Sequence, residues 1–342
     1  MKKTMACLAI GATALTLALT TAMPTTSARA EVTELRVPLG AGGFGFLPLH
    51  MMRKFQLVEK EAEKLGIKLT VNYARIGGPS VMNDALLSGS ADFISAGPPS
   101  FLILWDRTKG RGDVKGVAAM STMPMYLNTA SPDLKKLEDI KDGDKIAVTA
   151  VKVSIPAIIM QMYARDKEGA DKTFKYDPFT VSMTHPDGVV AMLSGNKQIT
   201  AHYTSPPFAQ RELEDGKIRT IQTTNDVMGG PQTFTMISTT TKFHNENPKV
   251  YAAFVAALKE SFNMIKNDKQ KAAEVLLESM GGKGWTTDQL IKILDQPDIY
   301  YTTKPENVMK YATFMNAIGT LKNKPASLDD LFFDAKSLGG GN

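Results

Sequence analysis

The side chains that most often do chemistry are few in this sequence, and they are scattered. The four histidines, His50, His185, His202 and His244, include no pair at the spacing of a metal site and no H-E-x-x-H motif. No G-x-S-x-G sequence provides a serine nucleophile. His185 and His202 follow or end predicted strands, so each could point into a cleft, although a structural or surface role is commoner for a single histidine. We therefore expect no catalytic residue, no metal site and no cofactor.

The only cysteine, Cys7, lies in an N-terminal segment with the pattern of a secretion signal. Lys2 and Lys3 precede an apolar run, and Ala28-Arg29-Ala30 is a small-x-small cleavage site. Cleavage after Ala30 would remove residues 1–30 as a signal peptide and leave a mature chain without thiols. Such a chain has no disulfide, no cysteine nucleophile and no Cys-ligated metal, and it suits an oxidising compartment outside the cytoplasm.

The charge balance of the mature chain is close to neutral. The whole sequence has 40 Lys and Arg against 35 Asp and Glu, and three of the basic residues lie in the leader. The sequence pI of 9.0 is therefore no argument for a nucleic-acid partner. No later apolar run approaches the roughly 18 residues of a membrane helix, so we expect a soluble product. Its length predicts two domains or lobes.

The glycine-rich run GAGGFG, residues 40–45, follows a predicted strand at residues 35–39 and formally satisfies G-x-G-x-x-G, the dinucleotide-binding pattern. The next predicted strand ends in Tyr73-Ala74-Arg75, with no carboxylate to bind a ribose. An exported protein also rarely meets nicotinamide cofactors. The run therefore favours a permissive ligand loop over NAD binding.

The stretch at residues 71–99 is the most informative part of the chain. It predicts a strand at residues 71–76, a glycine turn, a helix beginning near Ser80, a short strand at residues 92–95 and a turn at Gly97-Pro98-Pro99. Both turns follow strands, at the sheet edge where open α/β folds bind ligands. The first turn also places free N–H groups at a helix start, which suits an anion. An ordinary βαβ unit without a ligand remains the alternative.

The rest of the chain continues this alternation of strands and helices. Helices are predicted at residues 47–65, 100–107, 154–169, 187–193, 248–266, 270–280, 287–294 and 305–319, and strands at 67–75, 114–120, 145–150, 179–183, 199–203 and 218–222. Residues 84–89 (DALLSG) and 190–195 (VAMLSG) repeat one another, and each is followed by a strand and a Pro-Pro turn. This repeat predicts two similar units that face one cleft.

Two further sets of side chains have competing interpretations. Met120, Met123 and Met125 have thioethers that suit Cu(I), but methionine is plentiful in the chain and core packing is its commoner use. Arg75 and Lys152 are the cations nearest predicted strand ends and could pair with an anionic ligand. Solvated surface positions are at least as common for such residues.

Several short motifs occur in a characteristic order. They are the opening strand with its glycine-rich turn, ALLSGSAD at residues 85–92, LEDIKDGDKIAV at 137–148 and SLDDLF at 327–332. In this order the motifs resemble the solute-binding proteins of ABC importers for sulfonates, taurine and nitrate, which share the fold of the thiamine-precursor group. The resemblance covers nearly the whole mature chain. At residues 192–201 the chain reads MLSGNKQITA and lacks the acid that is usual in the family.

The resemblance implies an α/β fold of two lobes joined by a two-crossing hinge, the type II periplasmic-binding-protein fold. We expect residues 31–125 and 235–342 to form lobe one and residues 126–234 to form lobe two. Such a protein is a receptor and not an enzyme: it closes on its solute, and a permease recognises the closed form. The resemblance thus implies a periplasmic monomer that delivers a sulfonate-, taurine- or nitrate-like anion, or a small ring compound, to an ABC permease and its ATPase.

Within that fold we expect the turns at the strand ends to form the ligand cleft. Helix-start amides near Ser80 and Ser154 suit a sulfonate, carboxylate or nitrate, whereas Phe44, Tyr126, Tyr203 and Phe208 suit a ring. The predicted ligand-binding residues are Gly42, Gly43, Phe44, Gly78, Ser80 and Pro98 from lobe one and Lys152, Ser154, His185 and Tyr203 from lobe two. Replacement of Ser80 or Tyr203 by alanine is expected to weaken binding without unfolding the protein.

Two other function classes remain. A receptor for a TRAP-type transporter or for a sensor kinase is also a two-lobed binding protein. A pyrimidine-precursor enzyme on the same fold would need a reactive histidine and a cysteine-rich motif, and the mature chain has no cysteine.

Overall fold

Three small sheets contain the strands of the described residues. The computed structural model describes residues 30–40, 42–195 and 198–339, so the predicted signal peptide, apart from Ala30, lies outside the described residues. The strands in the described part are β1 (Glu34–Arg36), β2 (Thr70–Asn72), β3 (Ile94–Ala96), β4 (Val114–Thr122), β5 (Tyr126–Thr129), β6 (Ile146–Val148), β7 (Thr180–Ser182), β8 (Ala201–Thr204), β9 (Arg219–Thr223) and β10 (Thr233–Thr240).

Helices surround these sheets. Those of the described residues are α1 (Leu47–Phe55), α2 (Leu57–Lys64), α3 (Pro79–Leu87), α4 (Pro98–Thr108), α5 (Ile155–Glu168), α6 (His185–Leu193), α7 (Phe208–Leu213), α8 (Thr224–Met228), α9 (Thr241–Glu246), α10 (Pro248–Asn267), α11 (Lys269–Ser279), α12 (Thr287–Leu294), α13 (Val308–Ala317) and α14 (Leu328–Leu331). Short 3-10 helices occur at Phe44–Phe46, Leu137–Asp139, Ala170–Lys172, Asp177–Phe179 and Ala335–Leu338. None of the helices in the described ranges combines the length and the apolar character that a membrane crossing requires.

The order of the strands shows that the chain leaves the first sheets and later returns to them. β1 pairs with β2 in parallel, and the second sheet has the order β3-β10-β4 with β10 antiparallel to both neighbours. The third sheet has the order β7-β6-β8-β5-β9 and is built entirely from residues between β4 and β10. We call residues 126–228, which form this five-stranded sheet with α5–α8, the insert, and the other described residues from Glu31 onward the frame.

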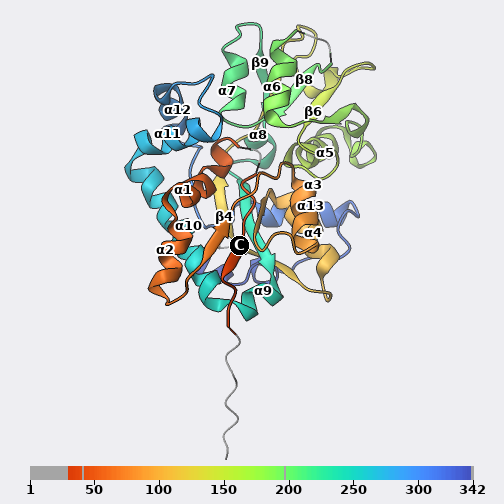
Figure 1. Cartoon of the computed structure of the whole chain (residues 1–342). Helices are drawn as coiled ribbons and strands as arrows, with labels where there is room; N and C mark the ends of the chain where they lie inside the picture. Colours follow the sequence, from red (N-terminus) through yellow and green to blue (C-terminus); the bar gives the residue numbers. More distant parts are fainter. Residues whose placement is uncertain (1–29, 41, 196–197, 340–342) are drawn as a thin grey trace, which may run out of the picture. The chain divides into compact units, whose positions relative to one another are not determined.

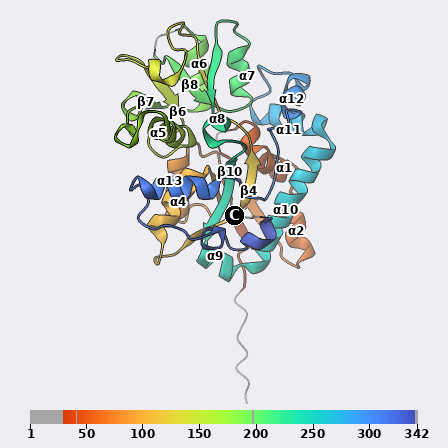
Figure 2. The same cartoon turned by 180° about the vertical axis from the view of Figure 1, so that it is seen from behind.

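Figures 1 and 2 show the same division from opposite sides. The helices and strands of the insert, coloured yellow-green to green, gather at the top, and α1, α2, α4, α10 and β4 of the frame lie below them. β10 runs beside β4 in the frame, as the register of the two strands requires. The frame and the insert together form one compact unit, Glu31–Asn342.

A long amphipathic helix covers the side of the frame next to α1 and α2. The buried residues of α10 recur at helical spacing, from Val250 through Ala253, Phe254, Ala257 and Leu258. Phe254 stacks on Phe93, which precedes β3, with ring centroids 4.0 Å apart. This packing fixes the short strand β3, and β3 carries a residue of the pocket described below.

The predicted helix at residues 47–65 is two helices in the structure. Gln56 adopts a left-handed backbone conformation, with φ of 52°, and separates α1 from α2. Both helices pack against α10 after this turn. The local sequence does not predict this break between the helices, because glutamine is not a residue that favours the left-handed conformation.

The predicted strand at residues 71–76 is shorter than expected. Only Thr70–Asn72 is a regular strand, although the backbone N–H groups of Val37 and Leu39 donate to the carbonyls of Asn72 and Ala74 and prolong the pairing with the first strand. The chain then leaves the sheet before the glycine turn and reaches α3 in an irregular conformation.

Candidate ligand-binding site

Four helices of the described residues begin at one pocket between the frame and the insert. The pocket is lined by Gly78 at the start of α3, Gly97 at the start of α4, Ser154 at the start of α5 and His185 in the first turn of α6. Each helix has a proline in its first two positions, where a missing N–H costs no helical hydrogen bond. The positive ends of four helix dipoles therefore point at one space.

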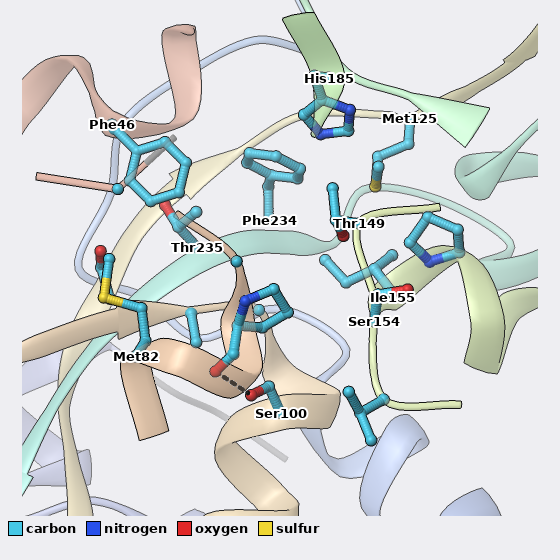
Figure 3. Close-up of a pocket in the computed structure, with 18 residues that line it drawn as sticks. Phe46, Met82, Ser100, Met125, Thr149, Ser154, Ile155, His185, Phe234 and Thr235 are labelled. Atoms are coloured by element: carbon cyan, nitrogen blue, oxygen red, sulfur yellow. Dashed lines mark hydrogen bonds between the residues drawn. The ribbon is translucent and has the colours of Figure 1, made fainter. Parts of the chain in front are cut away.

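The walls of this pocket are mainly apolar. Phe46, Met82, Met125, Ile155 and Phe234 contribute their side chains (Figure 3). The space between the lining atoms, including its open mouth, is about 570 Å³. No charged side chain occurs among the described residues that line it. An anion in this pocket would therefore meet helix N-termini and neutral hydrogen-bonding groups, and no cationic side chain among the described lining residues.

One hydroxyl group in the pocket has no partner. Ser95 on β3 is 1% exposed, and its Oγ makes no hydrogen bond. The other serines that line the pocket already donate: Ser154 Oγ to the carbonyl of Ala150 at 2.6 Å and Ser100 Oγ to that of Pro79 at 3.3 Å. Because a buried hydroxyl without a partner is costly, Ser95 is the side chain best placed to donate to a ligand.

His185 is the only titratable side chain among the described residues that line the pocket. Its ring (Figure 3) is buried, and its Nδ1 lies 3.1 Å from Oγ1 of Thr204, which does not line the pocket. Burial, with a smaller effect of His202, lowers the pKa of His185 to about 3, so the imidazole is neutral near pH 7. The ring centroid of His202 lies 5.7 Å from that of His185, and His202 pairs through Nδ1 with Glu212 at 2.6 Å. The arrangement provides a neutral hydrogen-bonding ring and offers no activated nucleophile.

The structure brings only some of the predicted site residues together. Gly78, Ser154 and His185 line the pocket. Gly43 and Phe44 lie against the turn before α7 instead: the Phe44 N–H donates to the carbonyl of Pro206 at 3.4 Å, and the Phe44 ring is fully buried. Gly42 lines a neighbouring pocket that contains several cations.

The remaining predicted residues lie outside the pocket lining. Ser80 is exposed on α3, Pro98 is buried one residue beyond the lining residue Gly97, and Lys152 lies in a separate surface hollow. The ring of Tyr203 is fully buried, and its hydroxyl donates to Gln222 at 3.3 Å. Tyr203 is therefore a core residue of the insert, and the expectation that Tyr203→Ala leaves folding intact has no support in its environment.

Sequence reasoning missed several lining residues. They are Phe46, Ser95, Met125, Thr149, Phe234 and Thr235. Met125 is almost fully buried, as the packing interpretation of the methionines expects, and also reaches the pocket. Ser95 and Thr149 stand at the ends of predicted strands, so their position was a usable signal. No local sequence signal marks Phe234 and Thr235, because only the pairing of β10 with β3 and β4 places them at the pocket.

The frame and the insert touch around the pocket. A Cβ atom added to Gly97 in the frame would lie 2.9 Å from the side chain of Ile155 in the insert, and one added to Gly43 would lie 2.9 Å from the ring of Phe208. Larger residues at these two positions would hold the two parts apart. The frame and the insert thus pack directly against each other at these two positions, and residues of both parts line the pocket.

Solved structures with the same architecture are available for comparison. The alkanesulfonate-binding protein of Xanthomonas axonopodis pv. citri, bound to MOPS, is 16% identical and has a TM-score of 0.68, with 90% of this chain and 98% of that chain covered. The periplasmic aliphatic sulphonate-binding protein of Escherichia coli is 17% identical, with a TM-score of 0.63 over 88% and 92% of the two chains. The periplasmic nitrate-binding protein of Synechocystis PCC 6803 is 15% identical, with a TM-score of 0.63 over 88% and 84%.

The chain has the periplasmic-binding-protein fold. The predicted α/β fold class and the predicted structural resemblance to sulfonate- and nitrate-binding proteins are thereby confirmed. No family model matches the chain, and no curated protein sequence matches it. The pocket is lined by residues of both the frame and the insert.

Proposed function

We propose that this chain is the periplasmic solute receptor of an ABC import system and that its solute has an oxyanionic head and an apolar body. The observation that carries the proposal is the convergence of four helix N-termini on one apolar pocket (Figure 3). The likeness to sulfonate- and nitrate-binding proteins supports the receptor role.

The helix ends favour an oxyanion for two reasons. Each N-terminus has the equivalent of roughly half a positive charge, and its first N–H groups lack an acceptor within the helix. In α3, α4 and α5 no side chain of the N-cap residue satisfies these groups. A sulfonate or carboxylate with two or three oxygens can accept several of them and also the Ser95 hydroxyl.

The apolar side chains of the pocket walls further restrict the class of solute. Phe46, Phe234 and the two methionines would cover an alkyl chain or a small ring. Taurine fits less well, because its ammonium group would find no carboxylate among the described lining residues. Nitrate has no apolar part to cover. We therefore favour an alkyl or aryl sulfonate, or the corresponding carboxylate.

The proposed mechanism is closure without chemistry. We propose residues 31–125 with 235–342 as lobe one and 126–234 as lobe two, which places the two crossings at the chain segments that join the frame to the insert. A solute held by α3 and α4 of one lobe and by α5 and α6 of the other has its full set of contacts only in the closed form. A permease that recognises this form would receive only loaded receptors.

The first test is a thermal-shift and calorimetric screen of the mature chain, residues 31–342. The compounds are butanesulfonate, benzenesulfonate, butyrate, taurine, nitrate and, as a neutral control, butanol. A bound solute at 100 times its Kd raises the free energy of unfolding by about 2.7 kcal/mol, so the midpoint should rise with sulfonate concentration. The recovered solute should be unchanged.

Two results would contradict the proposal. Turnover of the solute would indicate an enzyme, and a response to butanol equal to that to butanesulfonate would remove the role of the oxyanionic head. The TRAP and sensor alternatives differ in the partner: genes for an ATPase and a permease beside this one support the ABC role, and TRAP subunits or a kinase would oppose it.

A further inference from the structure

A second pocket adjoins the first one, and Gly40 lines both. It also lies between the frame and the insert, and its space, including the open mouth, is about 930 Å³. Three cationic side chains line it: Arg75 and Lys283 from the frame and Arg211 from α7 of the insert. No carboxylate occurs among its described lining residues. This pocket therefore differs in character from the apolar first pocket.

A buried histidine in this second pocket lacks hydrogen-bond partners. His50 on α1 is 2% exposed, and both its Nδ1 and its Nε2 are without a partner. Burial, with the charges of Arg53 and Arg75, lowers the pKa of His50 to about 4. The neutral ring nevertheless keeps an N–H donor that the protein does not use. Since unsatisfied buried donors are costly, a bound acceptor is the expected partner.

The cations of the second pocket are only partly neutralised. Arg211 pairs with Glu214 and lies over the ring of Trp285, 5.9 Å from its centroid. Arg75 donates to the carbonyl of Ser279 at 2.6 Å. In the described part of the chain, neither Arg75 nor Lys283 has a carboxylate partner; the neighbouring Glu278 pairs with Lys54. The pocket thus keeps an excess of positive charge beside an unused donor.

We propose that this second pocket binds a small multivalent oxyanion such as phosphate or sulfate. The anion would accept from His50 and lie between Arg75, Lys283 and Arg211. Because these cations come from both the frame and the insert, the bound anion stabilises the packing of the two parts against each other. By linkage, it also raises the affinity of the first pocket for its solute. The inference concerns a site separate from the proposed solute pocket and holds whichever solute that pocket takes.

The test is a calorimetric titration of the mature chain with sodium sulfate and with sodium phosphate, with sodium chloride at matched ionic strength as reference. The double variant Arg75→Gln/Lys283→Gln removes two exposed cations and leaves the core unchanged. Lys242→Gln/Lys249→Gln, at two exposed lysines of α9 and α10, is the matched control for loss of two charges. We expect saturable one-site binding of the anion. The double variant should lower its affinity by roughly 10-fold or more, since each charge-assisted contact contributes substantially. The control variant should leave the affinity unchanged.

A second readout identifies the position of the anion. Nitrogen NMR of the imidazoles, with His50→Gln to assign the His50 signals, should show that phosphate shifts these signals and raises the His50 pKa. Heats equal to those of chloride, an unchanged affinity of the double variant, or unaffected His50 signals would each overturn the proposal. Loss of phosphate binding in Ser95→Ala would also overturn it, because that variant alters only the first pocket.

Discussion

Replacement of Ser95 by alanine should change stability and ligand affinity in opposite directions. The Ser95 hydroxyl is buried at the solute pocket and has no partner in the protein. In the protein without solute it contributes only its desolvation cost. In the complex it is expected to donate to the oxyanion.

The expected changes in the free energy of unfolding and in solute affinity both follow from this hydroxyl group. An unsatisfied buried polar group costs about 1–3 kcal/mol, and its removal leaves a void of only one oxygen atom, so we expect Ser95→Ala to stabilise the protein without solute by about 1 kcal/mol. A hydrogen bond to a charged group contributes about 1.5–3 kcal/mol. Its loss should weaken binding about 10- to 100-fold.

The assay pairs urea denaturation with calorimetric titration of the best solute from the screen. Ser154→Ala is the matched control, because Ser154 also lines the pocket but its hydroxyl already donates to Ala150 at 2.6 Å. That variant should lose about 1 kcal/mol of stability and bind nearly as well as the original protein. If Ser95→Ala is less stable than the original, or binds the solute equally well, the reasoning about its unused donor is refuted.

Three further predictions address core, closure and pH. Tyr203→Ala should lower the free energy of unfolding by about 3–5 kcal/mol, as urea denaturation would show; a fully stable variant with weak binding would contradict this core role. Gly97→Ala should weaken solute binding several-fold in calorimetry, because its Cβ would crowd Ile155 in the closed form, while Gly216→Ala, whose Cβ has open space, should bind normally. Since the pKa of His185 is lowered to about 3, the unfolded chain takes up a proton below about pH 6.5 that the native protein takes up only near pH 3. Stability due to this group is therefore complete above pH 6.5 and falls with pH by about 1.4 kcal/mol per unit; denaturation at pH 7 and pH 5 should show a shallower loss in His185→Gln, and equal slopes would contradict it.

Local sequence signals predicted the helix starts at the pocket better than the residues between them. Gly78-Pro79 and Ser154-Ile155-Pro156 combine an N-cap type with a proline in the first turn, and such signals depend on only a few neighbouring residues. Gly97-Pro98-Pro99 contains the same signal: it predicts a turn with a helix from residue 100, whereas in the structure Pro98 and Pro99 already open α4.

The faces of the strands were not predictable in the same way. All four residues of β8 are buried, so alternation along the strand cannot tell whether His202 or Tyr203 points to the interface. A strand covered on both faces has no polar side to mark its orientation. Ser95 on β3 presents the same difficulty, because all three residues of that strand are buried as well. The partners that decide both cases come from distant parts of the chain.

The position of β10 constrains the order in which the chain can fold. β10 separates β3 from β4, and it is made only after the whole insert. A chain that is synthesised from its N-terminus therefore cannot complete the second sheet until residue 240 has been made. The insert, by contrast, is a contiguous segment whose strands all lie within about one hundred residues. Contacts between distant segments form slowly, so the segment synthesised in the middle should become ordered before the segment synthesised first. Until β10 is made, β3 and β4, which precede the insert, therefore lack the strand that pairs with both of them.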